Sequence, residues 1–298
     1  MSTSTLSTQP RTPLALIYAT QFAKDRVALV AVALFVLLLA IAICAPWISP
    51  QNPYDLRQLN ILDSQLPPGS KTATHTYWLG TDHQGRDVLS AIFYGLRISV
   101  IVGISSGILA FAIGTLVGVV AGYVGGRFDA LVMRVVDLQL AFPVFLLAVI
   151  LLALMGRGVD KVIFAIVAAQ WARYARTARA AALVESRKEY IEAARCTGLS
   201  GFSIVTTQLL RNCLPPVLVL AAVEIAFAIS LEATLSFLGL GLPITEPSLG
   251  LLISNGYQDL LNGKYWLSVF PGLALLLAIS SLNIIGDRLR EVLDPRST

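Results

Sequence analysis

Two carboxyl groups interrupt a long apolar stretch in the C-terminal third of the chain. Glu224 and Glu232 lie within residues 214–235, an otherwise uncharged run of the length that crosses a bilayer. Their spacing of eight places them about two turns apart on nearly one helix face. Ionisable groups in a membrane usually face a bundle interior or a water-filled cavity. We therefore expect a polar pore wall or gate contact, with hydrogen bonding between helices as the alternative.

A short charged segment, residues 187–197, has the pattern of an amphipathic helix. One side carries Tyr190, Ile191 and Ala194, and the other carries Lys188, Glu189, Glu192 and Arg195. Lys188 and Glu192 are four apart and can pair, and Gly198 suits a left-handed helix end. Such a helix could dock into a groove of a soluble partner or lie on lipid headgroups. The residues alone leave both open.

Other charged groups are predicted to have mainly structural roles. Asp82, Arg86 and Asp87 form a compact cluster that could hold a polar loop by ion pairing. Contact with a substrate or a binding protein is the alternative for that cluster. Arg134 and Asp137 are three apart and could pair on one helix face, with a gate role as the alternative.

The chain offers little for metal or enzyme chemistry. Its two histidines, His75 and His83, have no neighbouring Cys or Glu at metal-ligand spacing, so we predict no metal site. The sequence has neither the motifs of zinc proteases and serine hydrolases nor a phosphate-binding loop for ATP. We therefore expect neither an enzyme nor a bound cofactor.

The composition decides the class of protein in which these residues must be positioned. Of 298 residues, 56% are hydrophobic and only 13% are charged, and the mean hydropathy is +0.73. A soluble domain of this size carries nearly twice that share of charged residues. The sequence therefore predicts an all-α, polytopic membrane protein. A net charge of +4 follows from Lys and Arg flanking membrane spans and does not indicate nucleic-acid binding.

Six apolar runs have the length of membrane-spanning helices. They cover residues 27–48, 98–123, 135–155, 162–182, 214–235 and 266–286. Pro143 is expected to kink the third run. The fourth run is the least apolar, because Arg173, Arg176 and Arg179 recur every three residues on roughly one face. Near a membrane end, these arginines could extend to the surface.

Glycines recur at a spacing of four within residues 98–123. The pairs are Gly103/Gly107, Gly114/Gly118 and Gly118/Gly122. Small residues at this spacing form a smooth strip on one face of a helix, which lets a second helix approach closely. Three such pairs in one span predict a helix-packing face.

The distribution of positive charge predicts the orientation. Fifteen of the 22 Lys and Arg residues fall on one side of the predicted topology, which we assign to the cytosol. Both termini are then cytosolic. The predicted organisation is a cytosolic tail (1–26), a first span (27–48), an extracytosolic segment (49–97), a core membrane domain (98–287) and a cytosolic tail (288–298). The amphipathic helix lies in a cytosolic segment of the core domain, residues 183–213.

Five blocks of the chain resemble the permease subunits of bacterial ABC importers. Glu192-Ala193-Ala194 followed by Gly198 is similar to the EAA motif of that family. The other blocks are similar to the dipeptide, oligopeptide and nickel subfamily, and they are "LGTDHQGRDVLSAIFYGLRISV", "AGYVGGRFDALVMRVVDLQLAFP", "LEATLSFLGLGLP" and "GDRLREVLDPR". The long extracytosolic segment resembles the C-type member of a B/C permease pair.

The resemblance implies a six-span permease fold and several partners. These are a B-type permease as heterodimer partner, two cytosolic ATPases that use ATP and Mg, and a periplasmic solute-binding protein. It also implies that Tyr190, Glu192, Ala193, Ala194 and Gly198 couple the chain to an ATPase in the bacterial inner membrane. The implied cargo is a di- or oligopeptide, with nickel, glutathione or an opine-like solute as alternatives. A secondary transporter or channel is the rival class, but the internal repeats typical of those proteins are not seen in the sequence.

Overall fold

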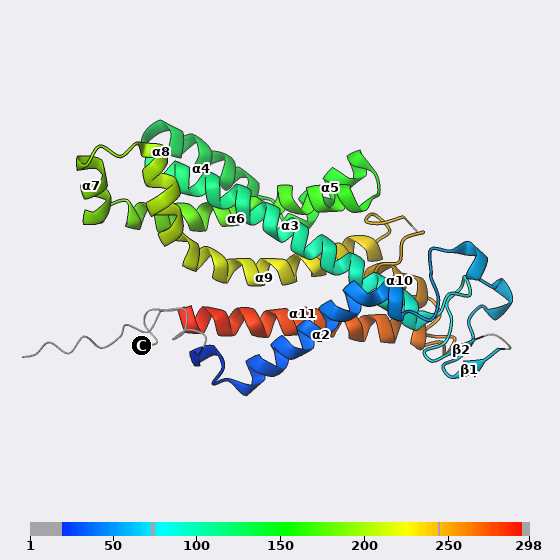
Figure 1. Ribbon diagram of the computed structural model, residues 1–298. Helices are drawn as coiled ribbons and strands as arrows, with labels where there is room; N and C mark the ends of the chain where they lie inside the picture. Colours follow the sequence, from blue (N-terminus) through cyan, green and yellow to red (C-terminus); the bar gives the residue numbers. More distant parts are fainter. Residues whose placement is uncertain (1–19, 73–74, 244, 294–298) are drawn as a thin grey trace, which may run out of the picture.

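The computed structural model describes residues 20–72, 75–243 and 245–293 and is almost entirely helical (Figure 1). Residues 1–19 of the predicted N-terminal tail and 294–298 of the predicted C-terminal tail lie outside these residues. The α-helices are α2 (Arg26–Ile48), α3 (Val88–Val124), α4 (Gly126–Ala141), α5 (Val144–Met155), α6 (Val159–Glu185), α7 (Glu189–Cys196), α8 (Gly201–Ser203), α9 (Leu210–Phe237), α10 (Leu249–Tyr257) and α11 (Trp266–Leu293). A π-helical stretch, Ile204–Leu209, joins α8 to α9.

The small non-helical part follows α2. It contains two 3₁₀ turns, Leu56–Gln58 and Ile61–Asp63, and an antiparallel hairpin of β1 (Ser70–Lys71) and β2 (Thr76–Tyr77). In the register of the hairpin, Ser70 lies opposite Tyr77. Figure 1 shows this hairpin at one end of the long helices and α7 at the other. The two polar segments of the sequence are thus at opposite ends of the bundle.

Four helical stretches are long and apolar enough to cross a membrane, and the bent pair α4 and α5 gives a fifth if it counts as one span. The four are Arg26–Ile48, Val88–Val124, Gly201–Phe237 and Trp266–Leu293. The sequence predicts six spans. The predicted span that is not among these five is α6, because its arginines and N-terminal charges lower its hydropathy. The predicted kink at Pro143 is a complete break, at which α4 and α5 meet at 90°.

The helix α3 begins ten residues earlier than the sequence predicts. Asp87 supplies the reason, because its carboxylate accepts a hydrogen bond from the backbone N–H of Ser90 at 2.8 Å. This is the N-cap interaction that satisfies a free donor in the first helical turn. The predicted extracytosolic segment therefore contains the first turns of α3.

Glycines hold α3 against two neighbouring helices. Gly114, Gly118 and Gly122 face α6, where a Cβ on Gly118 would lie only 2.2 Å from the carbonyl oxygen of Ala175. Gly103 and Gly107 face α9, where a Cβ would lie within 2.5 Å of Ile229 or Ile225 side chains. The predicted packing face is confirmed, and it serves two partners. Because no side chain separates the backbones, α3 and α6 lie in direct contact.

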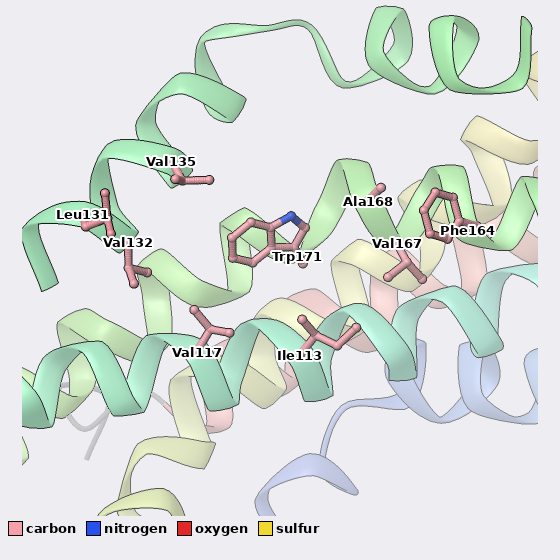
Figure 2. Close-up of a pocket in the computed structure, with 9 residues that line it drawn as sticks. All are labelled: Ile113, Val117, Leu131, Val132, Val135, Phe164, Val167, Ala168 and Trp171. Carbon is pink, nitrogen blue, oxygen red and sulfur yellow. The ribbon is translucent and has the colours of Figure 1, made fainter. Parts of the chain in front are cut away.

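The bundle also has an apolar pocket between α3, α4 and α6, with a volume of about 460 Å³ (Figure 2). Its lining is apolar from end to end, and the residues are Ile113, Val117, Leu131, Val132, Val135, Phe164, Val167, Ala168 and Trp171. Such a lining suits contact with lipid or with another apolar helix and offers no polar chemistry.

Candidate functional site

The amphipathic helix predicted at residues 187–197 is present as α7, Glu189–Cys196, at the end of the molecule opposite the hairpin (Figure 1). Ile191 is fully buried and Ala194 is 8% exposed, and both belong to a cluster that includes side chains of α3 and α6. Glu192 and Ala193 face outward. The apolar side of α7 therefore packs on its own chain, and the charged side is open.

A hydrogen-bonded network fixes the start of α7. Tyr190 Oη donates to Glu185 Oε2 at 2.7 Å, and Asn212 Nδ2 donates to Tyr190 Oη at 2.9 Å. Lys188 Nζ lies 2.6 Å from Glu185 Oε1. Burial opposes ionisation of Glu185, but its bonds from Lys188 and Tyr190 outweigh that effect, and the pKa of the carboxyl lies below its usual value. The network joins α6, α7 and α9 at one point.

The predicted pairing of Lys188 with Glu192 is wrong. Lys188 is the N-cap residue of α7 and has an extended backbone conformation (φ −79°, ψ 148°). Its ammonium turns back to Glu185 on α6 instead. Glu192 consequently stays on the outer face of α7.

Both hydrogen bonds of a Schellman motif terminate α7. The N–H of Gly198 donates to the carbonyl of Arg195 at 3.0 Å, and that of Leu199 donates to Ala194 at 3.2 Å. Gly198 has φ +77°, as the sequence predicts for a left-handed helix end. The guanidinium of Arg195 lies 5.3 Å above the ring of Tyr123, at the end of α3. The helix is thus tied at both ends.

Next to α7, two apolar side chains are open to solvent. Leu199 is 43% exposed and Phe202 is 80% exposed. Leu199 follows α7 and Phe202 lies on α8, so exposed apolar groups come directly after the exposed Glu192 and Ala193 of α7 in the chain. This arrangement suits contact with another protein, because exposed large apolar groups beside rigid structure gain by being covered.

A second polar region lies between the helices, where three arginines of α6 each pair with an acid on a neighbouring helix. Arg173 Nη1 lies 2.8 Å from Glu224 Oε1 of α9. Arg176 pairs with Asp137 at 2.5 Å and Arg179 with Asp129 at 2.6 Å, and both acids belong to α4. We call this set the arginine ladder. The sequence suggested that these arginines extend to the membrane surface, but each has a partner within the bundle.

The predicted pairing of Arg134 with Asp137 is also wrong. Asp137 pairs across helices with Arg176, while Arg134 lies exposed on α4. A bond between helices is favoured here because α4 and α6 pack against each other. The acid therefore helps to hold α4, whose C-terminal end lies at the 90° break.

Glu224 has the most polar surroundings of the ladder. It is 3% exposed, and the guanidinium of its partner Arg173 also lies 5.1 Å above the Phe227 ring. Within the described part of the chain, three buried oxygen atoms near this pair lack a hydrogen-bond partner, and they are Gln170 Oε1, Tyr174 Oη and Glu224 Oε2. Unpaired buried polar atoms are uncommon and mark places where water, a ligand or a second conformation completes the bonding.

Glu232 is in a different environment, although it lies on the same helix. It is fully buried, and it accepts hydrogen bonds of 2.8 Å from Ser99 on α3 and from Ser236 on α9. The arrangement is the one proposed above as the alternative to a pore contact, namely hydrogen bonding between helices. Glu224 and Glu232 thus contact different neighbours despite their shared helix face.

At the hairpin end of the molecule, the residues of the predicted cluster Asp82, Arg86 and Asp87 have two separate roles. Arg86 Nε lies 2.8 Å from Asp82 Oδ2, so that predicted ion pair is present, whereas Asp87 caps α3 and takes no part in it. His83 Nε2 lies 2.8 Å from Asp259 Oδ2 in the segment before α11. Across the described ranges, no group of three or more His, Cys, Asp or Glu side chains could hold a metal.

The chain matches two family models and several known proteins. Residues 114–298 match the family described as "Binding-protein-dependent transport system inner membrane component", and residues 15–68 match "N-terminal TM domain of oligopeptide transport permease C". The dipeptide transport system permease protein of Haemophilus influenzae is 34% identical over 99% of both chains. The glutathione transport system permease protein of Pectobacterium atrosepticum is 36% identical over 93% of this chain and 89% of its own.

The fold has a match among solved structures. An inward-facing form of the MetNI methionine ABC transporter includes a chain that aligns with a TM-score of 0.56. That alignment covers 68% of this chain and 97% of the other, at 23% sequence identity. At this identity the match supports the fold alone.

Proposed function

The chain belongs to the family of binding-protein-dependent transport system inner membrane components, and we propose that it forms part of the pore of an ATP-driven peptide importer. It is a permease subunit of an ABC transporter and a multi-pass protein of the inner membrane. The peptide cargo is supported by relatives named for dipeptide transport. The relative named for glutathione transport supports that tripeptide as a second candidate.

The single observation that carries the proposal is the anchored helix α7. Its apolar side is buried, its two ends are bonded to other helices, and its EAA-containing outer face is open. A partner that moves Glu192 and Ala193 therefore moves α6, α9 and α3 with them. Such a contact drives transport only if the partner binds one state of the pore more tightly than the other.

The proposed assembly contains a second permease, two cytosolic ATPases and an external solute-binding protein. ATP and Mg would be used by the ATPases. The excess of Lys and Arg on the α7 side supports a cytosolic position for α7 and for both chain ends. The hairpin end would then face the binding protein, and its bonds from His83 to Asp259 would hold that surface together.

Purified importer in liposomes tests the assignment. We expect uptake of labelled trialanine only when both permeases, both ATPases, the binding protein and ATP are present. Uptake by this chain alone would contradict the proposal and favour a secondary transporter. Uptake of glutathione but not trialanine would select the second candidate.

Cysteine labelling tests the coupling surface. In a Cys196→Ser background, which removes the exposed native thiol, Ala193→Cys should react freely with maleimide and become protected when the ATPases are bound. Leu261→Cys serves as the control, because this residue is 98% exposed at the opposite end of the molecule. Equal protection at both positions, or none at either, would contradict the coupling role of α7.

A further inference from the structure

We propose that a polar pocket at the α4–α5 break binds the carboxylate of a peptide during its passage through the membrane. This inference rests on the proposed peptide import. The pocket has a volume of about 680 Å³, which is within the range of small-molecule sites. Residues 140–144 of the break line one side, and Arg173, Arg176 and Thr177 of α6 line another, with Leu220 of α9.

The two arginines are held in place but keep donors for a ligand. Arg173 uses Nη1 for Glu224, and Arg176 uses Nη2 for Asp137. A guanidinium has five N–H donors, so each retains further donors within the described contacts. The Arg173 side chain is 36% exposed and that of Arg176 is 54% exposed. Arginine binds carboxylates through two parallel hydrogen bonds, which this exposure permits.

The pocket lies part of the way along α6, away from the end that leads to α7. The helix α6 has 27 residues, so it is roughly 40 Å long at 1.5 Å per residue. Arg176 is nine residues from Glu185, which places it roughly 14 Å from the α7 end of the helix. Ionisable side chains within a bundle of membrane-spanning helices are commonly found where a solute or ion passes.

The ligand class follows from what peptides have in common. Their side chains vary in size and charge, but each linear peptide with a free C-terminus ends in a carboxylate. A pore that must move different peptides can therefore recognise that group without recognising the sequence. The backbone of the break adds further polarity, because the last carbonyls of α4 and the first N–H groups of α5 lie outside regular helical bonding.

The existing ion pairs suit a peptide that passes through the pocket rather than one that stays bound there. Each arginine is already neutralised by an acid, so a carboxylate that enters must share a guanidinium with Asp137 or Glu224. A guanidinium that is already paired with an acid attracts the peptide carboxylate less strongly than an unpaired guanidinium would. The peptide would thus be oriented but released readily toward the next site on its path.

The test uses the assembled importer in nanodiscs of zwitterionic lipid, without the binding protein. A cysteine at Thr177, in the Cys196→Ser background, reports occupancy of the pocket by its rate of maleimide labelling. We expect trialanine to protect this cysteine at roughly tenfold lower concentration than trialanine amide, since the amide lacks the charge-assisted bonds. The Asp137→Asn/Arg176→Gln double variant should remove this preference.

The matched control is the Asp129→Asn/Arg179→Gln double variant, which removes the neighbouring pair of the ladder on the same two helices but outside the pocket. It should keep the preference for trialanine over the amide. Equal protection by acid and amide, or a preference that survives in the Arg176 variant, would overturn the inference. Protection by anionic lipid but not by trialanine would assign the pocket to lipid. Normal trialanine uptake by the wild type in those cases would leave the proposed function intact.

Discussion

The anchor of α7 and the arginine ladder both hold helices together, but with different interactions. At α7, a buried apolar side fixes the helix, and the Glu185–Tyr190–Asn212 network locks its start at the protein surface. In the ladder, charged side chains lie between helices and pair across them. In the first region, one hydrogen-bonded network joins α6, α7 and α9 at the surface. The second holds helices together through ion pairs that can be exchanged.

This difference predicts different costs when one partner is lost. Exposed ion pairs contribute little to stability because water solvates both charges. A buried charge without its partner is strongly destabilising. The comparison is therefore tested by substitutions in the two regions, measured as free energies of unfolding of the purified chain.

The largest effect is expected in the ladder. Arg173→Gln leaves the buried carboxylate of Glu224 without its cation, and should cost about 3 kcal/mol of stability. The double variant Arg173→Gln/Glu224→Gln removes both charges and should recover most of that loss. A single variant as stable as the wild type would show that Glu224 is not a buried charge.

Gly198→Ala should have the next largest effect. At φ +77° an alanine Cβ is strained even though no atom lies near it, so we expect a cost of about 1 kcal/mol. Peptide uptake should also fall, and by more than the loss of folded protein explains, because the end of α7 would be displaced. Gly272→Ala is the control, since that glycine also has open space but no positive φ. Equal effects of the two variants would contradict the role of the helix end.

Tyr190→Phe should cost about 1 kcal/mol, because it removes the hydroxyl that bonds both Glu185 and Asn212. The ring keeps its packing, so the variant isolates the hydrogen bonds. We expect lower coupling, measured as peptide taken up per ATP hydrolysed. Tyr257→Phe, at a 61% exposed position, is the control and should change neither quantity. An unchanged ratio in Tyr190→Phe would mean that packing alone anchors α7.

The smallest effect is expected from Lys188→Met. The lysine side chain is 52% exposed, so its pair with Glu185 should contribute at most about 1 kcal/mol. The effect should shrink further as salt is added, because exposed pairs are screened. A loss as large as that of Arg173→Gln would remove the contrast between the two regions.

Sequence reasoning succeeded where the structure depends on neighbours in the chain. The pattern of Tyr190, Ile191 and Ala194 identified the helix, and Gly198 identified its end, because both signals are local. The glycine spacing of α3 identified a packing face for the same reason.

It failed where partners are distant in sequence. The ladder pairs join residues 51, 39 and 50 positions apart, and no periodicity within α6 indicates which helix supplies each acid. The pocket at the break was missed for a related reason. Pro143 predicts a bend, but the 90° angle between α4 and α5 depends on how each of these helices packs against the rest of the bundle.

The continuous helix α3 has a mechanical consequence. Its 37 residues extend over roughly 55 Å, from the cap at Asp87 to the ring of Tyr123 beneath Arg195. Glycine contacts with α9 and α6 lie in between, so both neighbouring helices pack directly on the middle of α3. A tilt of about 5° would move one tip by roughly 5 Å relative to the other. In the proposed importer, a displacement of the α7 end would thus be transmitted to the hairpin end along a single continuous helix.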